Sequence, residues 1–109
     1  FFGGQYSHAI RKGAMLSHDQ GLETALYRPE SIEARAPTAV ERDTAEAVLD
    51  ALPFPRTSLT YARVDLVLDG AGQPMVLELE LLEPSIFLGY DDGAADRIAA
   101  AIAAHPALA

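Results

Sequence analysis

Three acidic side chains lie at strand-like spacing in the second half of the chain. Asp65 belongs to the segment 59–68, and Glu78 and Glu80 belong to the segment 75–82. In both segments apolar residues alternate with the others, which is the two-residue period of a strand with one buried face. Because the linker between them is rich in glycine and ends in proline, we expect a tight turn and an antiparallel hairpin.

The polarity pattern favours one pairing register for this hairpin, because a slip of one residue would mix its apolar and charged faces. The expected cross-strand pairs are Asp69 with Pro74, Val67 with Val76, Asp65 with Glu78, and Arg63 with Glu80. Side chains directly opposite each other lie about 5 Å apart at Cβ. Three carboxylates therefore gather beside one guanidinium, and their excess negative charge favours a divalent cation.

Carboxylate oxygens without thiolate or imidazole partners are typical ligands of Mg²⁺ or Mn²⁺. We therefore predict a metal site formed by Asp65, Glu78 and Glu80. The alternative is a solvated charged face on which Arg63 pairs with Glu80 and no metal binds. The spacing alone does not choose between the two.

The hairpin sequence ARVDLVLDGAGQPMVLELELLEPS resembles the last hairpin of the ATP-grasp ligases, the superfamily that includes glutathione synthetase and D-alanine-D-alanine ligase. In that superfamily an Asp in the penultimate strand and a Glu-x-Asn in the final strand hold two magnesium ions against the nucleotide phosphates. The resemblance implies that Asp65 and Glu78 are the first two ligands and that Glu80 stands at the asparagine position. A carboxylate there still offers oxygen to a metal but adds a negative charge, which departs from the pattern.

A second match, GQYSHAIRK at residues 4–12, is similar to a strand in a bacterial subset of the superfamily that includes the cyclo-ligase of cycloserine biosynthesis. There the strand runs beneath the nucleotide. The resemblance implies nucleotide contacts from Arg11, Lys12 and Leu77. It also implies catalytic roles for Arg11 and Arg63, whose forked donors suit the charge of a transferred phosphoryl group. Because Arg11 and Lys12 are consecutive, only one of them easily faces the phosphate, and a solvated strand end is the alternative for both.

Other candidates carry weaker signals. His8 could contact substrate, but a lone histidine in an apolar strand is more often a hydrogen-bonded core residue. His18 lies beside Asp19 without a third ligand at helical or hairpin spacing, which argues against a metal site there. Glu83 follows the acidic strand and could contact an amine, with a surface turn acid as the alternative.

Further strands and helices are expected around the hairpin. The expected ranges are 5–12 for a strand, 29–33 for a short edge strand or turn, 38–52 for one helix and 93–105 for a second. Thr38 and Glu41 match the capping-box pattern, and Asp91 or Asp92 is expected to cap the second helix. We expect the first helix to cover the apolar face of the hairpin. The predicted fold class is α+β: the C-terminal portion of an ATP-grasp domain, with an antiparallel sheet and a final acidic hairpin packed against two helices.

Composition limits the other possibilities. The 109 residues make one domain at most, and 50% of them are hydrophobic, which excludes a disordered chain. The net charge of -8 argues against nucleic acid and acidic membranes as partners. Without cysteine there is neither a disulfide nor a thiolate metal site, and no apolar stretch is long enough to span a membrane. We expect a cytoplasmic protein.

With the resemblance, we expect residues 1–109 to be the C-terminal part of an ATP-grasp catalytic domain, inactive without its N-terminal domain and nucleotide lobe. The expected activity is an ADP-forming ligation of a carboxylate to an amine or similar nucleophile, through an acyl phosphate and with Mg²⁺ or Mn²⁺. The expected partners are ATP, the two substrates and the remainder of the polypeptide, and the sequence leaves room for a homo-oligomer. The alternatives are a non-catalytic nucleotide-binding module and a structural domain with a solvated acidic face.

Overall fold

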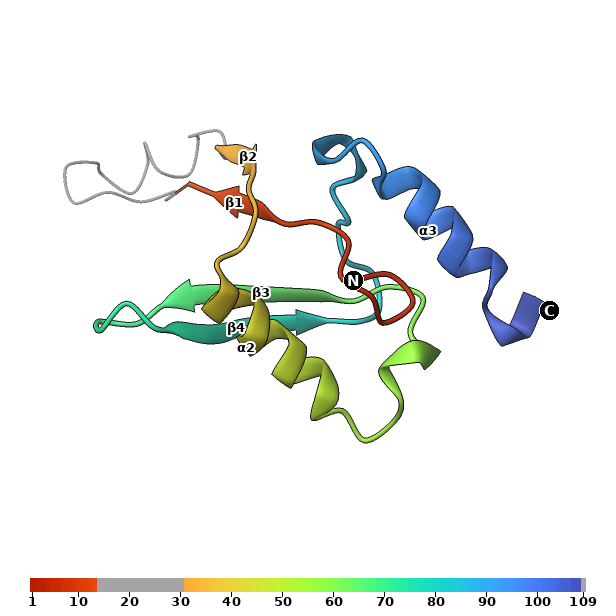
Figure 1. The fold of residues 1–109 in the computed structure, drawn as a ribbon, viewed down its shortest axis with the longest axis horizontal. Helices are drawn as coiled ribbons and strands as arrows, with labels where there is room; N and C mark the ends of the chain where they lie inside the picture. The colour runs from red at the N-terminus through yellow and green to blue at the C-terminus, as the bar shows by residue number, and fades with distance from the viewer. Residues whose placement is uncertain (14–30, 109) are drawn as a thin grey trace.

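The computed structural model describes residues 1–13 and 31–108. These residues form two antiparallel two-stranded sheets and two α-helices (Figure 1), so the predicted α+β class is confirmed. The elements are, in chain order, β1 (Ile10–Lys12), β2 (Ile32–Ala34), α2 (Ala39–Asp50), the 3₁₀ helix η1 (Arg56–Ser58), β3 (Arg63–Leu68), β4 (Pro74–Glu80), η2 (Leu88–Tyr90), α3 (Ala94–Ala103) and η3 (Pro106–Leu108). None of the helices in this part of the chain combines the length and apolar character needed to cross a bilayer.

The hairpin β3–β4 has the predicted register in its acidic half and a different one near its turn. Asp65 lies opposite Glu78, and Arg63 lies opposite Glu80, as predicted. A β-bulge after Asp65 then shifts the pairing by one residue. The pairs near the turn are Leu66 with Val76, Val67 with Met75, and Leu68 with Pro74, so the predicted pairs of Val67 with Val76 and Asp69 with Pro74 are wrong.

The turn explains this shift. Asp69 donates its N–H to Gln73 O at 2.8 Å, and its carboxylate oxygen Oδ1 accepts the N–H groups of Ala71 and Gln73, both at 2.8 Å. Gly72 has a φ of +77°, which glycine adopts without penalty. Asp69 thus closes the turn with Gln73 instead of Pro74, and β4 carries one extra residue, Leu77, between the two registers.

The predicted strand 5–12 is wrong in its first half. Phe2 and Gln5 exchange two backbone hydrogen bonds, at 2.8 and 3.0 Å, around a pair of glycines with φ of 60° and 81°. The chain thus reverses just before the predicted strand, residues 6–9 are not part of a strand, and β1 begins only at Ile10. It pairs antiparallel with β2, which includes the last two residues of the predicted edge segment 29–33.

The first residues of the chain lie against the start of the hairpin. Ala62 donates its N–H to Phe1 O at 2.9 Å, and Phe2 forms an isolated β-bridge with Tyr61. Because these residues pair with the N-terminal turn instead of with β4, β3 begins later than residue 59, where the alternation predicts its start.

Helix α2 forms as predicted. Thr38 Oγ1 accepts the Glu41 N–H at 3.2 Å, and Glu41 Oε1 accepts the Thr38 N–H at 2.8 Å, which is the reciprocal capping box. The helix contacts both strands of the hairpin, and its apolar stripe includes Ala45 and Leu49, of which Leu49 is only 1% exposed. Helix α2 therefore packs on the hairpin, but it covers the predicted apolar face only in part, because Leu68, Met75 and Leu77 of that face remain exposed.

Helix α3 begins and ends differently from the prediction. Gly93 occupies the N-cap position and makes no side-chain capping bond. The Asp91 carboxylate, one of the two expected caps, instead accepts the Gly93 N–H at 3.1 Å and pairs with Arg97. The last helical residue precedes His105, the predicted end, because the chain there turns into η3.

The packing of α3 also differs in detail. Ala94 and Ile98 form a small core with Phe2, and Tyr61 and Ile86 pack against it. Helix α3 therefore lies toward the end of the hairpin opposite its turn, beside the N-terminal reversal, whereas α2 packs on the hairpin itself (Figure 1).

The capping box gives a first prediction. Thr38→Ala removes the acceptor of the Glu41 N–H and should lower the free energy of unfolding by about 1 kcal/mol. The hydrogen bond from the Thr38 N–H, followed by weaker contributions, lowers the pKa of Glu41 below its ordinary 4.5. The stability that ionised Glu41 contributes to the folded protein is therefore fully present above pH 4.5, and it is lost as the pH falls through the lower folded-state pKa of Glu41.

Urea unfolding of the full-length protein, followed by circular dichroism at several pH values, measures both effects. Asp43→Asn is the matched control, because Asp43 is an exposed acid on the same helix. Equal losses in the Thr38 and Asp43 variants would contradict the assignment.

Candidate functional site

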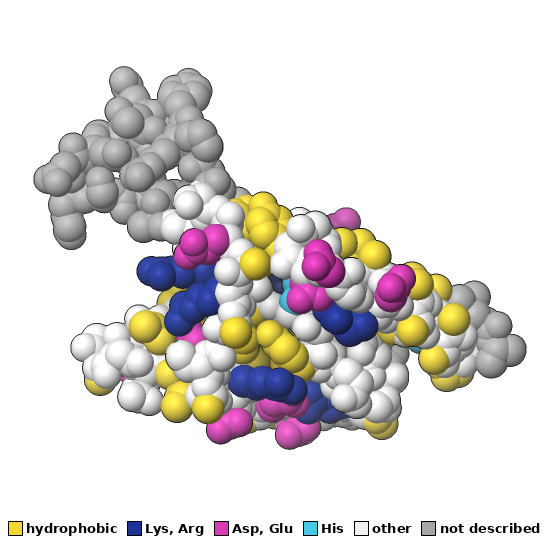
Figure 2. Space-filling model, turned by 45° about the horizontal axis from the view of Figure 1, so that its top comes forward, with side chains coloured by type: hydrophobic (Ala, Val, Ile, Leu, Met, Phe, Trp, Pro, Cys, Tyr) yellow, Lys and Arg dark blue, Asp and Glu magenta, His cyan; other side chains and the backbone are white. Residues whose placement is uncertain are grey.

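A cleft of about 880 Å³ lies between β1 and the hairpin. Of the seven lysine and arginine residues in the described ranges, five line it: Arg11, Lys12, Arg35, Arg42 and Arg63. Figure 2 shows basic side chains at several points of one face, with acidic side chains beside them. Although the chain has a net charge of -8, the cleft lining has five basic side chains against three acidic ones, Glu41, Asp65 and Glu78, and this local excess favours anionic ligands.

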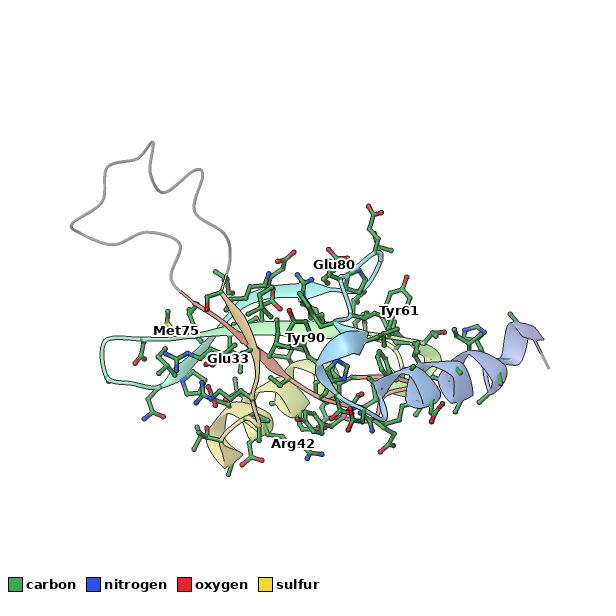
Figure 3. All side chains as sticks on the ribbon, turned by 90° about the horizontal axis from the view of Figure 1, so that it is seen from above. Glu33, Arg42, Tyr61, Met75, Glu80 and Tyr90 are labelled. Carbon is green, nitrogen blue, oxygen red and sulfur yellow. The ribbon has the colours of Figure 1, made fainter. Side chains whose placement is uncertain are left out.

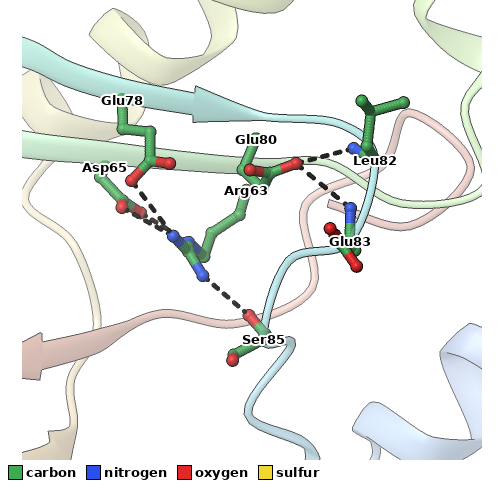
Figure 4. A network of polar contacts seen from close by, with 7 residues as sticks. All are labelled: Arg63, Asp65, Glu78, Glu80, Leu82, Glu83 and Ser85. Carbon is green, nitrogen blue, oxygen red and sulfur yellow. Dashed lines mark hydrogen bonds and ion pairs between the residues drawn. The ribbon is translucent and has the colours of Figure 1, made fainter.

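The acidic pair of the hairpin meets at one arginine in this cleft. Arg63 Nε donates to Asp65 Oδ1 at 2.9 Å, and its Nη2 donates to Asp65 Oδ2 at 3.1 Å. The same Nη2 also contacts Glu78 Oε2 at 3.4 Å (Figure 4). Asp65 and Glu78 are thus brought together as predicted, with the guanidinium acting as their counter-ion.

Arg63 remains fully charged in this setting. Partial burial alone would lower its pKa, but the hydrogen bonds to Asp65 and the charges of Asp65 and Glu78 together raise the pKa of the guanidinium. Its Nη1 also donates to Ser85 O at 3.4 Å. Arg63 therefore links the two acids to the segment that follows β4.

Glu80 behaves differently from the other two acids. It lies at the end of β4 away from the turn, whereas Met75 lies near the turn (Figure 3). Its Oε1 accepts the N–H groups of Leu82 at 2.8 Å and Glu83 at 3.2 Å. These hydrogen bonds, with that of Leu82 first, lower the pKa of Glu80. Glu80 is directly opposite Arg63, yet in this conformation it anchors the next turn.

Glu80 is thus not gathered with the other acids. Within residues 1–13 and 31–108 no group of three or more acidic, histidine or cysteine side chains is arranged to hold a metal ion. The alternative in which Arg63 pairs with Glu80 does not occur either, because Arg63 pairs with Asp65 and Glu78. The site as it stands is a pair of carboxylates with one guanidinium.

Both basic residues at the end of β1 line the cleft, whereas alternation along a strand predicts that only one would face it. The Lys12 ammonium lies 5.5 Å from the centre of the Phe87 ring. Leu77, expected at the nucleotide, is the extra residue of the bulge; it is 67% exposed and lines the same cleft.

The remaining candidates fall into two groups. The half-buried His8 ring makes hydrogen bonds to Ser7 Oγ at 2.7 Å and Ile86 O at 2.9 Å, as expected of a core histidine. Glu83 is exposed, and its backbone N–H belongs to the turn anchored by Glu80. His18 and Asp19 lie outside the described residues.

Some cleft residues were not found by sequence reasoning. Arg42 is an exposed residue of α2 whose guanidinium lies over the Tyr6 ring at 4.2 Å. Arg35 follows β2 and pairs with Glu41 at 3.5 Å. The positive charge of Arg42 and Arg35 in an acidic chain was the sequence feature that could have pointed to them. No sequence feature pointed to Phe87, which also lines the cleft.

The role of Arg63 as counter-ion gives a second prediction. Arg63→Gln leaves Asp65 and Glu78 facing each other without a cation, which should cost about 1 kcal/mol of unfolding free energy in the presence of a chelator. Mg²⁺ should recover part of that loss, because it can compensate the same two carboxylates. Thermal unfolding of the full-length protein with and without Mg²⁺ measures this difference.

Arg42→Gln is the matched control, since Arg42 lines the same cleft but pairs with Glu46 on its own helix at 3.7 Å. An equal response of both variants to Mg²⁺ would show that Arg63 does not compensate the acidic pair.

Comparisons with known proteins were made at the level of sequence and of structure. No family model matches the chain. It is 43% identical over 110 residues to the cycloserine biosynthesis protein DcsG of Streptomyces lavendulae, a match that covers 94% of this chain and 35% of that protein. The crystal structure of D-cycloserine synthetase DcsG matches with a TM-score of 0.71, over the same shares of the two chains. The chain is therefore homologous to DcsG and spans about a third of its length.

Proposed function

We propose that this chain supplies the metal-binding and phosphate-binding part of an ATP-dependent, ADP-forming ligase. The reaction would join a carboxylate to an amine or a similar nucleophile through an acyl phosphate. The observation that carries the proposal is the convergence of Asp65 and Glu78 on Arg63 in a cleft that is lined by basic side chains. Homology to a synthetase, DcsG, supports a biosynthetic ligase.

The acidic pair has the donor chemistry that Mg²⁺ or Mn²⁺ needs. Asp65 Oδ2 and Glu78 Oε2 both contact one nitrogen atom, Arg63 Nη2, at 3.1 and 3.4 Å, so a cation in the place of that guanidinium would meet an oxygen of each acid. Mg²⁺ usually takes one or two protein carboxylates and leaves its other positions to water and phosphate. When bound, the metal would supply positive charge to the phosphate oxygens. We assign Asp65 and Glu78 as its ligands.

Glu80 is the third ligand in this proposal, at the position where the ATP-grasp pattern has asparagine. Its carboxylate must first leave the N–H groups of Leu82 and Glu83, which it now accepts. Leu82 and Glu83 are exposed, so water can take the place of the carboxylate at their N–H groups. A second metal ion would depend on this rearrangement.

The basic side chains of the cleft would position the nucleotide phosphates. Arg63 and Arg11 present planar guanidinium groups, which bind phosphate oxygens in pairs and stay charged. Lys12 adds a point charge from the same strand end as Arg11. These groups would stabilise the charge of the transferred phosphoryl group, while Leu77 would offer an apolar contact to the nucleotide.

A non-catalytic nucleotide-binding module is the second candidate. The observation that favours it is the state of Glu80, whose carboxylate is engaged with backbone and adds a negative charge where the pattern has a carboxamide. The two candidates differ in turnover but not in binding. Formation of ADP by the full-length protein with mixtures of carboxylates and amines therefore separates them.

The proposal predicts the effect of neutralising the acidic pair. Asp65→Asn and Glu78→Gln keep the size of each side chain but remove its charge. In the full-length protein each should lower ADP formation at least about 100-fold, because even outer-shell changes at metal sites cost 10- to 100-fold. Folding should be retained, because both side chains are partly exposed at the cleft.

Coupled ADP assays with a Mg²⁺ titration measure the loss, and circular dichroism checks the fold. Asp43→Asn on α2 is the matched control, an exposed aspartate outside the cleft lining. Turnover that survives in Glu78→Gln at ordinary Mg²⁺ concentration would contradict the assignment of the metal ligands.

A further inference from the structure

A line of hydrogen bonds outside the acidic pair connects α3 to the segment that follows β4. Arg97 Nε donates to Ser7 Oγ at 2.9 Å. Ser7 Oγ lies 2.7 Å from His8 Nδ1, and His8 Nε2 lies 2.9 Å from Ile86 O. Arg97 is itself held by the Asp91 carboxylate. The line joins residues far apart in the sequence, and His8 is its central member.

The donors in this line all point the same way. A guanidinium N–H can only donate, and a carbonyl oxygen can only accept. His8 Nε2 therefore carries the hydrogen donated to Ile86 O, and Ser7 Oγ accepts from Arg97. With a single hydrogen on the ring, His8 Nδ1 then accepts the hydrogen of the Ser7 hydroxyl. The neutral tautomer of His8 with hydrogen on Nε2 satisfies every member of the line.

The last bond of the line fixes a strained part of the cleft wall. Ile86 directly precedes Phe87, which has φ of 48° and ψ of 49° and, among the described residues, is the one non-glycine with positive φ. A bulky side chain in this left-handed region is strained and persists only where its surroundings hold it. The bond from His8 to Ile86 O supplies one such restraint.

The strained residue belongs to the segment 85–87, which contacts basic groups on both sides of the cleft. Ser85 O accepts from Arg63 Nη1 at 3.4 Å, and the Phe87 ring lies 5.5 Å from the Lys12 ammonium. Tyr90 packs edge-on against the same ring, with centroids 6.1 Å apart. A change in the backbone at Ile86 would therefore move contacts of both Arg63 and Lys12.

We infer that His8 is a positioning residue for this cleft. Its Nε2 donates to Ile86 O, holds Phe87 in its left-handed conformation, and so keeps the segment 85–87 against Arg63 and Lys12. The part of this inference that concerns turnover rests on the proposed function. The part that concerns the hydrogen bonds of His8 and the conformation of Phe87 does not depend on the proposed function.

The test uses three variants of the full-length protein. His8→Leu removes both hydrogen bonds of the ring, whereas the amide of His8→Gln can still donate to Ile86 O. His105→Leu is the matched control, since His105 is a histidine beyond the end of α3 and outside the cleft lining. We expect His8→Leu to lower kcat about tenfold with little change in the KM for ATP, as a small misplacement of catalytic groups does. His8→Gln should recover most of the loss.

Nuclear magnetic resonance gives a readout that needs no turnover. With ¹⁵N-labelled histidine, neutral His8 should show hydrogen on Nε2. The backbone amide resonance of Phe87 should shift in His8→Leu and return toward its original position in His8→Gln. If His8→Leu does not fold, the tautomer of the unchanged protein and the Gln variant still decide.

The outcomes separate this inference from the proposed function. Hydrogen on Nδ1, or an unmoved Phe87 resonance in His8→Leu, overturns the positioning role whether or not the protein turns over ATP. Unchanged kcat in a folded His8→Leu protein that does turn over ATP also overturns it. Absence of ADP formation in the unchanged protein, with the expected tautomer and Phe87 shifts, counts against the proposed function alone.

Discussion

The opposition of two carboxylates across the hairpin is the constraint on which the site depends. Asp65 and Glu78 are cross-strand neighbours, so their backbones place the two carboxylates close to each other. Arg63 provides the compensating charge by a two-pronged contact to one acid and a single contact to the other. The turn at Asp69 and helix α2 hold the hairpin in place, and through the hairpin they also hold the acidic pair that lines the cleft.

The sequence predicts the acidic half of the hairpin better than its turn. Alternation at period two specifies which residues share a face, and the pairing of Asp65 with Glu78 satisfies it. Near the turn, the choice depends on local bonds of one side chain, because the Asp69 carboxylate accepts two N–H groups and closes the loop at Gln73. Those bonds outweigh the apolar match, and Leu77 is left exposed. A polarity pattern carries no information about them.

The same distinction applies to the other elements and to the candidate site. Helix α2 is predictable because its capping box is local, whereas the strand expected at residues 5–12 depends on pairing with a distant segment and forms only at Ile10–Lys12, opposite β2. At the site, strand register places a residue but does not determine where its side chain points. Glu80, for example, turns to the backbone N–H groups of Leu82 and Glu83. The approach of Arg42 to the cleft arises from packing between elements distant in sequence, which no local pattern reveals.

The distribution of charge limits what the cleft can attract. The chain as a whole is acidic, so an extended polyanion would meet net repulsion, whereas the cleft lining has five basic side chains against three acidic ones and can attract a small anion. Screening at physiological salt acts over about 8 Å, so a ligand within the cleft senses chiefly those neighbours. In the proposed function, a cation on the acidic pair would also release the fork of Arg63 for a phosphate oxygen. The counter-ion of the acidic pair would then become a ligand of the nucleotide phosphates.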